Sequence, residues 1–197
     1  MKISESGQIP HQLLRPFFGF WDERRGRRPW PRRQEITLDD LRRAAANAAF
    51  CRIERPYRDL DSLHFVNVGT AIEQATGQRL TGMTVGQLLR GVGSSPEFTY
   101  CFSEYGQVAT EGCCTYNEGN FPWPNHSWLS YRRLVMPLGE GDEPDALFVV
   151  IDLNAVGLGL TVPQTLRAFD GQDAGPAQPW KMPALQILPG TGTAPRD

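Results

Sequence analysis

The sequence predicts an α+β domain: an antiparallel sheet of about five strands with helices packed on one face, preceded by a flanking N-terminal helix. Strand-like segments occur as a pair within residues 50–68 and as a run of three within residues 112–153, and helices with capping signals lie between them. A hydrophobic fraction of 40% and a charged fraction of 21% are typical of a globular protein. The chain of 197 residues is long enough for one domain with a substantial core.

The chain divides by composition into three parts. Residues 1–36 form the flanking helix and a basic connector, residues 37–155 the α+β domain, and residues 156–197 a tail rich in proline and glycine with little structure of its own. No apolar run approaches the roughly 20 residues that span a bilayer, and the first residues lack the features of a secretion signal. We therefore expect a cytoplasmic protein that has no membrane partner.

The first predicted element is an amphipathic helix over residues 15–25. Pro16 lies in its first turn, where a missing N–H costs nothing. Its apolar side chains recur at helical spacing: Leu14, Phe17, Phe18 and Trp21. This face is covered either by the domain's own sheet or by another chain. We expect it to be the interface with a second copy in a homodimer, or with a separate signalling protein.

Arginines cluster directly after this helix, although the formal net charge of the chain is −2. One interpretation is a binder of a nucleotide-like or other anionic small ligand, in which Arg27, Arg28 and Arg33 hold the anion in bidentate fashion. The other is a solvated basic loop, or one that pairs with acidic residues elsewhere. Nucleic acid is not an expected partner, because the domain as a whole is not basic.

A second helix is predicted from Thr37 to about Ala48, with Thr37 and Asp40 spaced as a capping box. Strands over 50–55 and 63–68 follow and are expected to form an antiparallel hairpin.

Two short helices come next, and each opens with a threonine that has an acid or amide three residues on. Thr70 is followed by Glu73, and Thr84 by Gln87. A longer helix opens with Pro96, and strands are then predicted over 112–116, 128–138 and 146–153. Aromatic side chains from these elements are expected to line a ligand pocket between the sheet and the helices: Phe65, Phe98, Phe102, Tyr105 and Tyr131.

Sequence motifs for catalysis, metal binding and phosphate loops are absent. Neither the three histidines nor the four cysteines have metal-ligand spacing, and no nucleophile motif of a hydrolase occurs. The adjacent Cys113 and Cys114 are interpreted as thiols, with a redox role as the alternative. We predict no catalytic residues and no metal site, and the sequence does not identify a cofactor.

Several short motifs, in order along residues 13–153, resemble a PAS-like family common in alphaproteobacteria. They are Phe20-Trp21, Gly26-Arg27, Pro31-Arg32-Arg33, Val68-Gly69-Thr70, Gly77-Gln78-Arg79-Leu80-Thr81-Gly82 and Leu134-Val135-Met136-Pro137-Leu138. The resemblance implies a PAS-like sensory domain and no catalytic residue set. The chain departs from the family at His64 to Asn67, where relatives tend to carry a Tyr-Arg pair, and in the insert 117–127.

An aromatic cluster lies in and beside this insert. It consists of Tyr116, Phe121, Trp123 and Trp128, interleaved with prolines. Its two interpretations are a surface for a partner or ligand, because Trp and Tyr are enriched at binding hot spots, and a loop folded over the sheet. Together these observations predict a non-catalytic sensory or protein-interaction module of signal transduction, with the anion binder as the alternative.

Overall fold

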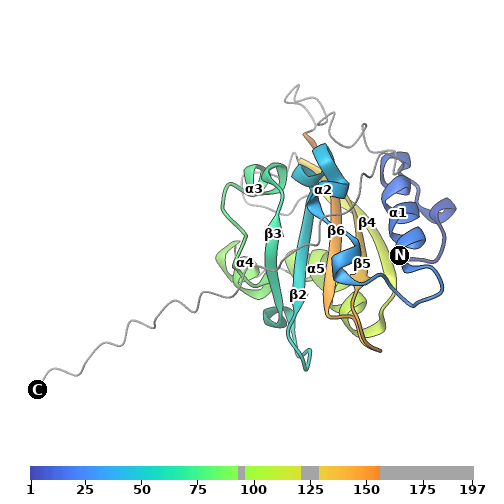
Figure 1. Cartoon of the computed structure of the whole chain (residues 1–197). Coiled ribbons are helices and arrows are strands. Elements are labelled where there is room, and N and C mark those ends of the chain that lie inside the picture. The colour runs from blue at the N-terminus through green and yellow to red at the C-terminus, as the bar shows by residue number, and fades with distance from the viewer. Residues whose placement is uncertain (93–95, 121–128, 156–197) are drawn as a thin grey trace, which may run out of the picture.

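The computed structural model describes residues 1–92, 96–120 and 129–155. Their centre is an antiparallel sheet with the strand order β1-β4-β5-β6-β2-β3 (Figure 1). The strands are β1 (Lys2–Ile3), β2 (Ala48–Ile53), β3 (Leu63–Val68), β4 (Cys114–Asn120), β5 (Leu129–Leu138) and β6 (Ala146–Ala155). The α-helices are α1 (Arg15–Arg25), α2 (Leu38–Leu41), α3 (Thr70–Thr76), α4 (Val85–Val92) and α5 (Pro96–Glu111). The 3-10 turns are η1 (Ser6–Gln8), η2 (Gln12–Leu14), η3 (Arg33–Glu35), η4 (Arg42–Asn47) and η5 (Leu60–Ser62).

The mixed helix and strand content and the antiparallel sheet agree with the sequence prediction. β2 and β3 form the expected antiparallel hairpin, and β5 and β6 pair in register from Leu129↔Ala155 to Leu138↔Ala146. The sheet has six strands because β1 adds to the edge of β4, with Ile3 opposite Cys114. A strand of two residues is too short to show a two-residue period, so the sequence pattern did not indicate it.

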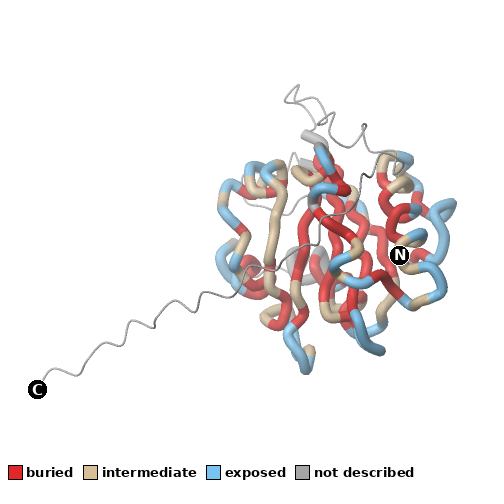
Figure 2. The backbone as a smooth tube through the Cα atoms, viewed as in Figure 1, coloured by how far each residue is buried: buried red, intermediate tan, exposed pale blue. Residues whose placement is uncertain are grey.

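Helices cover both faces of the sheet, so the prediction of helices on one face was wrong. We call the face covered by α3, α4 and α5 the inner face, and the face covered by α1, α2 and η4 the outer face. On β5, Val135 belongs to the inner core and Leu134 to the outer core. Successive side chains of a strand point to opposite faces, and the two helix layers therefore bury both sides of the central strands (Figure 2).

The aromatic face of α1 packs on the outer face of the chain's own sheet. Leu14, Phe17, Phe18 and Trp21 are all buried there. The indole Nε1 of Trp21 donates a 2.8 Å hydrogen bond to the carbonyl oxygen of Pro137 on β5. The prediction that these four side chains form an interface with another chain was therefore wrong, because the sheet already buries them.

The helix expected over residues 37–48 is interrupted. Its capping signal is confirmed, since Thr37 N donates to Asp40 Oδ2 at 2.8 Å and Asp40 N donates to Thr37 Oγ1 at 3.2 Å. The α-helix nevertheless ends at Leu41, and the 3-10 turn η4 begins at Arg42, whose φ is 48°. Left-handed backbone conformation at this residue stops the helical hydrogen-bond pattern, although the alanines that follow favour a helix.

The two predicted capping boxes have different outcomes. At α4, Thr84 N donates to Gln87 Oε1 at 2.8 Å and Gln87 N donates to Thr84 Oγ1 at 2.9 Å, which confirms the box. At α3 the N-cap is Gly69, which has no side chain to cap with, and Glu73 instead accepts a hydrogen bond from Leu80 N. The prediction for Thr70 was therefore wrong. None of the helices in the described ranges combines the length and apolar character needed to cross a bilayer.

Candidate functional site

Four of the five aromatic residues predicted to line a pocket lie together on the inner face. Phe65 comes from β3, Phe102 and Tyr105 from α5, and Tyr131 from β5, and all four are buried in the inner core. The rings of Phe102 and Tyr105 lie 5.3 Å apart between centroids. The side chain of the fifth, Phe98, lies outside the described residues.

These aromatic residues surround a buried ion pair that sequence analysis did not select. The guanidinium of Arg133 on β5 donates through Nε to Glu104 Oε1 on α5. Arg133 is 1% exposed and Glu104 is 6% exposed. The Arg133 guanidinium carbon lies 5.2 Å from the ring centroid of Phe102 and 4.9 Å from those of Tyr105 and Tyr131. At these distances the rings attract the cation through their π faces.

The positions of these two charges follow from the elements that hold them. Arg133 lies on the same face of β5 as Tyr131 and Val135, since alternate residues of a strand share a face. Glu104 lies one residue from Tyr105 on α5, and both side chains contact Arg133. The alternation of Tyr131, Arg133 and Val135 in the sequence could have predicted the buried arginine, because it places Arg133 on the same strand face as two core residues.

The charge of Arg133 also acts on Cys51, which lies on β2 and is fully buried in the inner core. Burial raises the pKa of the Cys51 thiol far above its usual range, and the nearby Arg133 opposes this only in part. The thiol therefore stays protonated at neutral pH and is a poor nucleophile. The inner face therefore encloses, within an apolar surround, an arginine that already holds a carboxylate.

The arginine cluster after α1 is largely paired with acidic side chains. Arg28 Nη2 lies 2.7 Å from Glu35 Oε2, and Arg33 Nε lies 3.2 Å from Asp145 Oδ1. Arg27 is exposed. Two of the three arginines proposed to hold an anion are therefore engaged with carboxylates of the same chain, which was the other interpretation of this cluster.

The adjacent cysteines Cys113 and Cys114 and the predicted aromatic cluster were the other candidate groups. Cys113 and Cys114 are free thiols, and burial raises the pKa of both. No group of three His, Cys, Asp or Glu side chains in the described ranges is placed to hold a metal ion. Tyr116 is buried on β4, whereas the rest of the aromatic cluster, Phe121, Trp123 and Trp128, lies outside the described residues.

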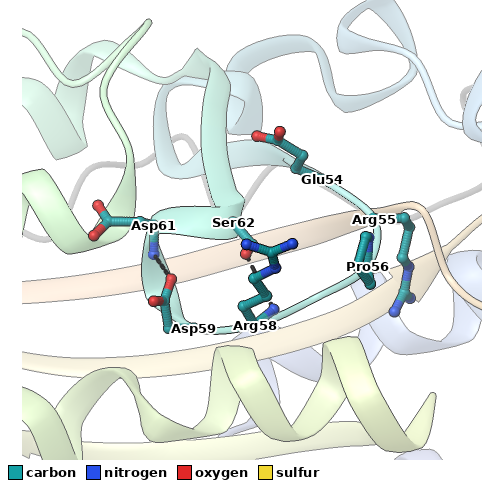
Figure 3. Close-up of a pocket in the computed structure, with 7 residues that line it drawn as sticks. All are labelled: Glu54, Arg55, Pro56, Arg58, Asp59, Asp61 and Ser62. Atoms are coloured by element: carbon teal, nitrogen blue, oxygen red, sulfur yellow. Dashed lines mark hydrogen bonds between the residues drawn. The ribbon is translucent and has the colours of Figure 1, made fainter.

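A polar hollow of about 360 Å³ lies in the loop between β2 and β3, lined by residues within 54–62 (Figure 3). Asp61, one of the lining residues, accepts two hydrogen bonds from Arg90 and one from Thr84. These contacts attach the loop to α4. The ion pair of Asp61 and Arg90 thus has a structural role at this hollow, and Figure 3 shows Asp61 and Arg55 at opposite ends of the loop.

No protein-family model matches the chain, and no curated protein is significantly similar to it. The resemblance to the PAS-like family therefore stays a prediction from the motifs in the sequence.

Proposed function

We propose that the chain is a non-catalytic, PAS-like sensory module of signal transduction that recognises a small anionic molecule on the inner face of its sheet. The observation that carries this proposal is the ion pair of Arg133 and Glu104, buried among aromatic rings in an otherwise apolar core. Buried charges with a specific charge partner occur at functional sites as well as in structural ion-pair networks.

The order of elements supports the PAS-like part of the proposal. β2 and β3 are followed by the short helices α3 and α4, the longer helix α5 and the antiparallel run β4, β5 and β6. This is the order that the resemblance implies. The helices α3, α4 and α5 enclose the inner face, which is where the sequence analysis placed the ligand.

Energetics support a recognition role for the ion pair. Taking two charges out of water is expensive, and replacing a buried pair by well-packed apolar side chains is often neutral or stabilising, by about 1–4 kcal/mol. The ion pair is therefore expected to add little to the net free energy of unfolding. Arginine binds carboxylates through a planar fork of N–H groups, and the group that Arg133 holds is a carboxylate.

The chemistry of the pair indicates both the ligand and the response. A small carboxylate ligand would take the place of Glu104 on Arg133. Because Glu104 belongs to α5 and Arg133 to β5, this exchange removes a tie between the helix and the sheet. A separate signalling protein, or a second copy of the chain, would then recognise the altered position of α5.

Two measurements test the proposal. Native mass spectrometry of the purified protein, compared with the denatured protein, reports a retained small molecule and its mass. Isothermal titration with acetate, succinate and benzoate then measures carboxylate binding to the wild type and to two variants. We expect Glu104→Gln to bind a carboxylate more tightly than the wild type, because the internal competitor has lost its charge. Arg133→Gln is expected to lose binding.

Arg28→Gln is the matched control, because it removes an arginine that pairs with a carboxylate away from the inner face. Its affinity should equal that of the wild type. Loss of binding in this variant alone would instead assign the anion to the arginine cluster. No retained molecule, together with no carboxylate binding by the wild type and by folded Glu104→Gln or Glu104→Asp, would refute the proposal.

A further inference from the structure

A row of charged side chains crosses the outer face of the sheet near one end. Glu118 on β4, Arg132 on β5 and Asp152 on β6 are direct register partners. Arg132 lies 3.3 Å from Asp152 Oδ2 through Nη1 and 3.9 Å from Glu118 Oε2 through Nε. His11 completes the row from the N-terminal segment, with its Nε2 3.4 Å from Asp152 Oδ2.

This N-terminal segment, residues 1–14, is attached to the sheet at both of its ends. At the start, Met1 N donates to Tyr116 O at 2.9 Å and Tyr116 N donates to Met1 O at 2.8 Å, and Lys2 also pairs with Glu111 at the end of α5. Towards the other end, Ile9 and Leu14 are fully buried in the outer core. His11 lies between these two apolar contacts and is the polar contact of the segment with Asp152.

Two polar atoms at this contact are buried without a partner. In the described part of the chain, neither His11 Nδ1 nor Asp152 Oδ1 has a hydrogen-bond partner. His11 Nε2 is the ring nitrogen that faces Asp152, and in the neutral tautomer that carries its hydrogen on Nε2 the other nitrogen, Nδ1, is an acceptor only. A protonated His11 would carry a second N–H at Nδ1, and a buried donor without an acceptor is costly.

We infer that His11 is a pH-sensitive latch: protonation of its imidazole weakens the attachment of residues 1–14 to the sheet and opens the β1 edge. We call the state in which residues 1–14 pack on the sheet the closed form. A neutral His11 imidazole is compatible with the closed form, whereas a protonated imidazole adds a buried N–H donor that has no acceptor there. The groups that face this region in the described ranges are Asp152, Arg132, Glu118 and Tyr116 from the sheet, and Arg15 from α1. The hydroxyl of Tyr116 donates to Glu118 at 2.6 Å, and Arg15 donates to the carbonyl of Ile9 at 2.8 Å.

The direction of the His11 titration agrees with the latch. Burial lowers the pKa of His11 below its ordinary value of 6.5, and Arg132 lowers it further, while Asp152 and Glu118 oppose the shift. The closed form therefore binds the proton less readily than the open form does. The contribution of His11 to closure is fully present above pH 6.5 and is lost as the pH falls below that value through the lowered pKa.

Amide exchange measured by NMR tests the latch on the full chain. The amide of Tyr116 reports closure, because its N–H donates to Met1 O. The amide of Phe65, which donates to Met83 O on the β3 side of the sheet, serves as the internal reference. After correction for intrinsic exchange, we expect the protection factor of Tyr116 to fall severalfold between pH 7.5 and pH 5, while that of Phe65 stays constant.

Two histidine variants distinguish the latch from a general effect of acid. His11→Gln keeps an N–H donor for Asp152 but does not titrate, so protection of Tyr116 should become independent of pH. His64→Gln removes a histidine that pairs with Glu54 on the β3 side, and it should retain the wild-type response. The inference is overturned if the Tyr116 response is absent in the wild type, persists in His11→Gln, or is matched by Phe65. A measured His11 pKa at or above 6.5 would also overturn it.

Discussion

The Nε1–H of Trp21 and the carbonyl oxygen of Pro137 form a 2.8 Å hydrogen bond that joins α1 to β5 across the outer face. Both ends of this contact are buried, and it links segments that are far apart in the chain. The flanking helix is therefore part of the core of the domain.

Trp21→Phe should lower the free energy of unfolding. It removes the donor and leaves a buried carbonyl without that partner, at an expected cost of about 1–3 kcal/mol. Urea denaturation followed by far-UV circular dichroism measures the change. Phe18→Leu serves as the comparison, since it reduces apolar packing on the same helix without removing a hydrogen bond. A Trp21→Phe variant as stable as the wild type would contradict the role given to this bond.

The ion pair of the inner face predicts a strongly non-additive double-mutant cycle. Arg133→Met and Glu104→Met should each cost about 3–5 kcal/mol, because each removes one partner of a buried ion pair and leaves the other partner in the core. The double variant should recover most of this loss, since two apolar side chains replace the pair. Chemical denaturation of the wild type, the two single variants and the double variant gives the coupling free energy of the two side chains. Additive losses would mean that the two side chains do not depend on each other.

The outcome of the two capping boxes predicts unequal effects for two similar substitutions. Thr84→Ala should destabilise the protein by about 1 kcal/mol, because Thr84 caps α4 through Gln87 N. Thr70→Ala should change stability by less than about 0.5 kcal/mol, as expected for a surface site without such a contact. Thermal unfolding of both variants tests this difference. Equal losses would contradict the assignment of Gly69 as the N-cap of α3.

Asp61 should titrate well below an ordinary aspartate. Hydrogen bonds from Arg90 and Thr84 lower its pKa from 3.8 to about 2. Its contribution to stability is therefore present above pH 3.8 and is lost as the pH falls towards 2. Carboxyl chemical shifts measured by NMR report this midpoint. Because the pair is exposed to solvent, Arg90→Gln should change stability little while raising the Asp61 midpoint towards 3.8. An unchanged midpoint in this variant would contradict the contact.

Much of the secondary structure was predictable because it depends on local patterns. Residues 63–68 were predicted as a strand and form β3, and the box of Thr84 and Gln87 was predicted from its spacing. The break at Arg42 was not predictable, since tertiary contacts there override the helix propensity of the alanines that follow.

The candidate sites depend on contacts between distant parts of the chain. Glu104 and Arg133 lie on different elements, and neither position carries a sequence signal of its partner. The same holds for His11 and Asp152. The coverage of α1 was left open between two alternatives because periodicity shows that a face is buried but not what buries it.

Arg132 and Arg133 are neighbours on β5, and their side chains pair with acids on opposite faces of the sheet. Arg133 meets Glu104 on the inner face, and Arg132 meets Asp152 on the outer face. A single rigid peptide unit joins them, so a shift of the backbone that re-aims one guanidinium also moves the other. Occupancy of the inner face and closure of the N-terminal segment are therefore expected to influence each other's equilibrium, with the same coupling free energy in both directions.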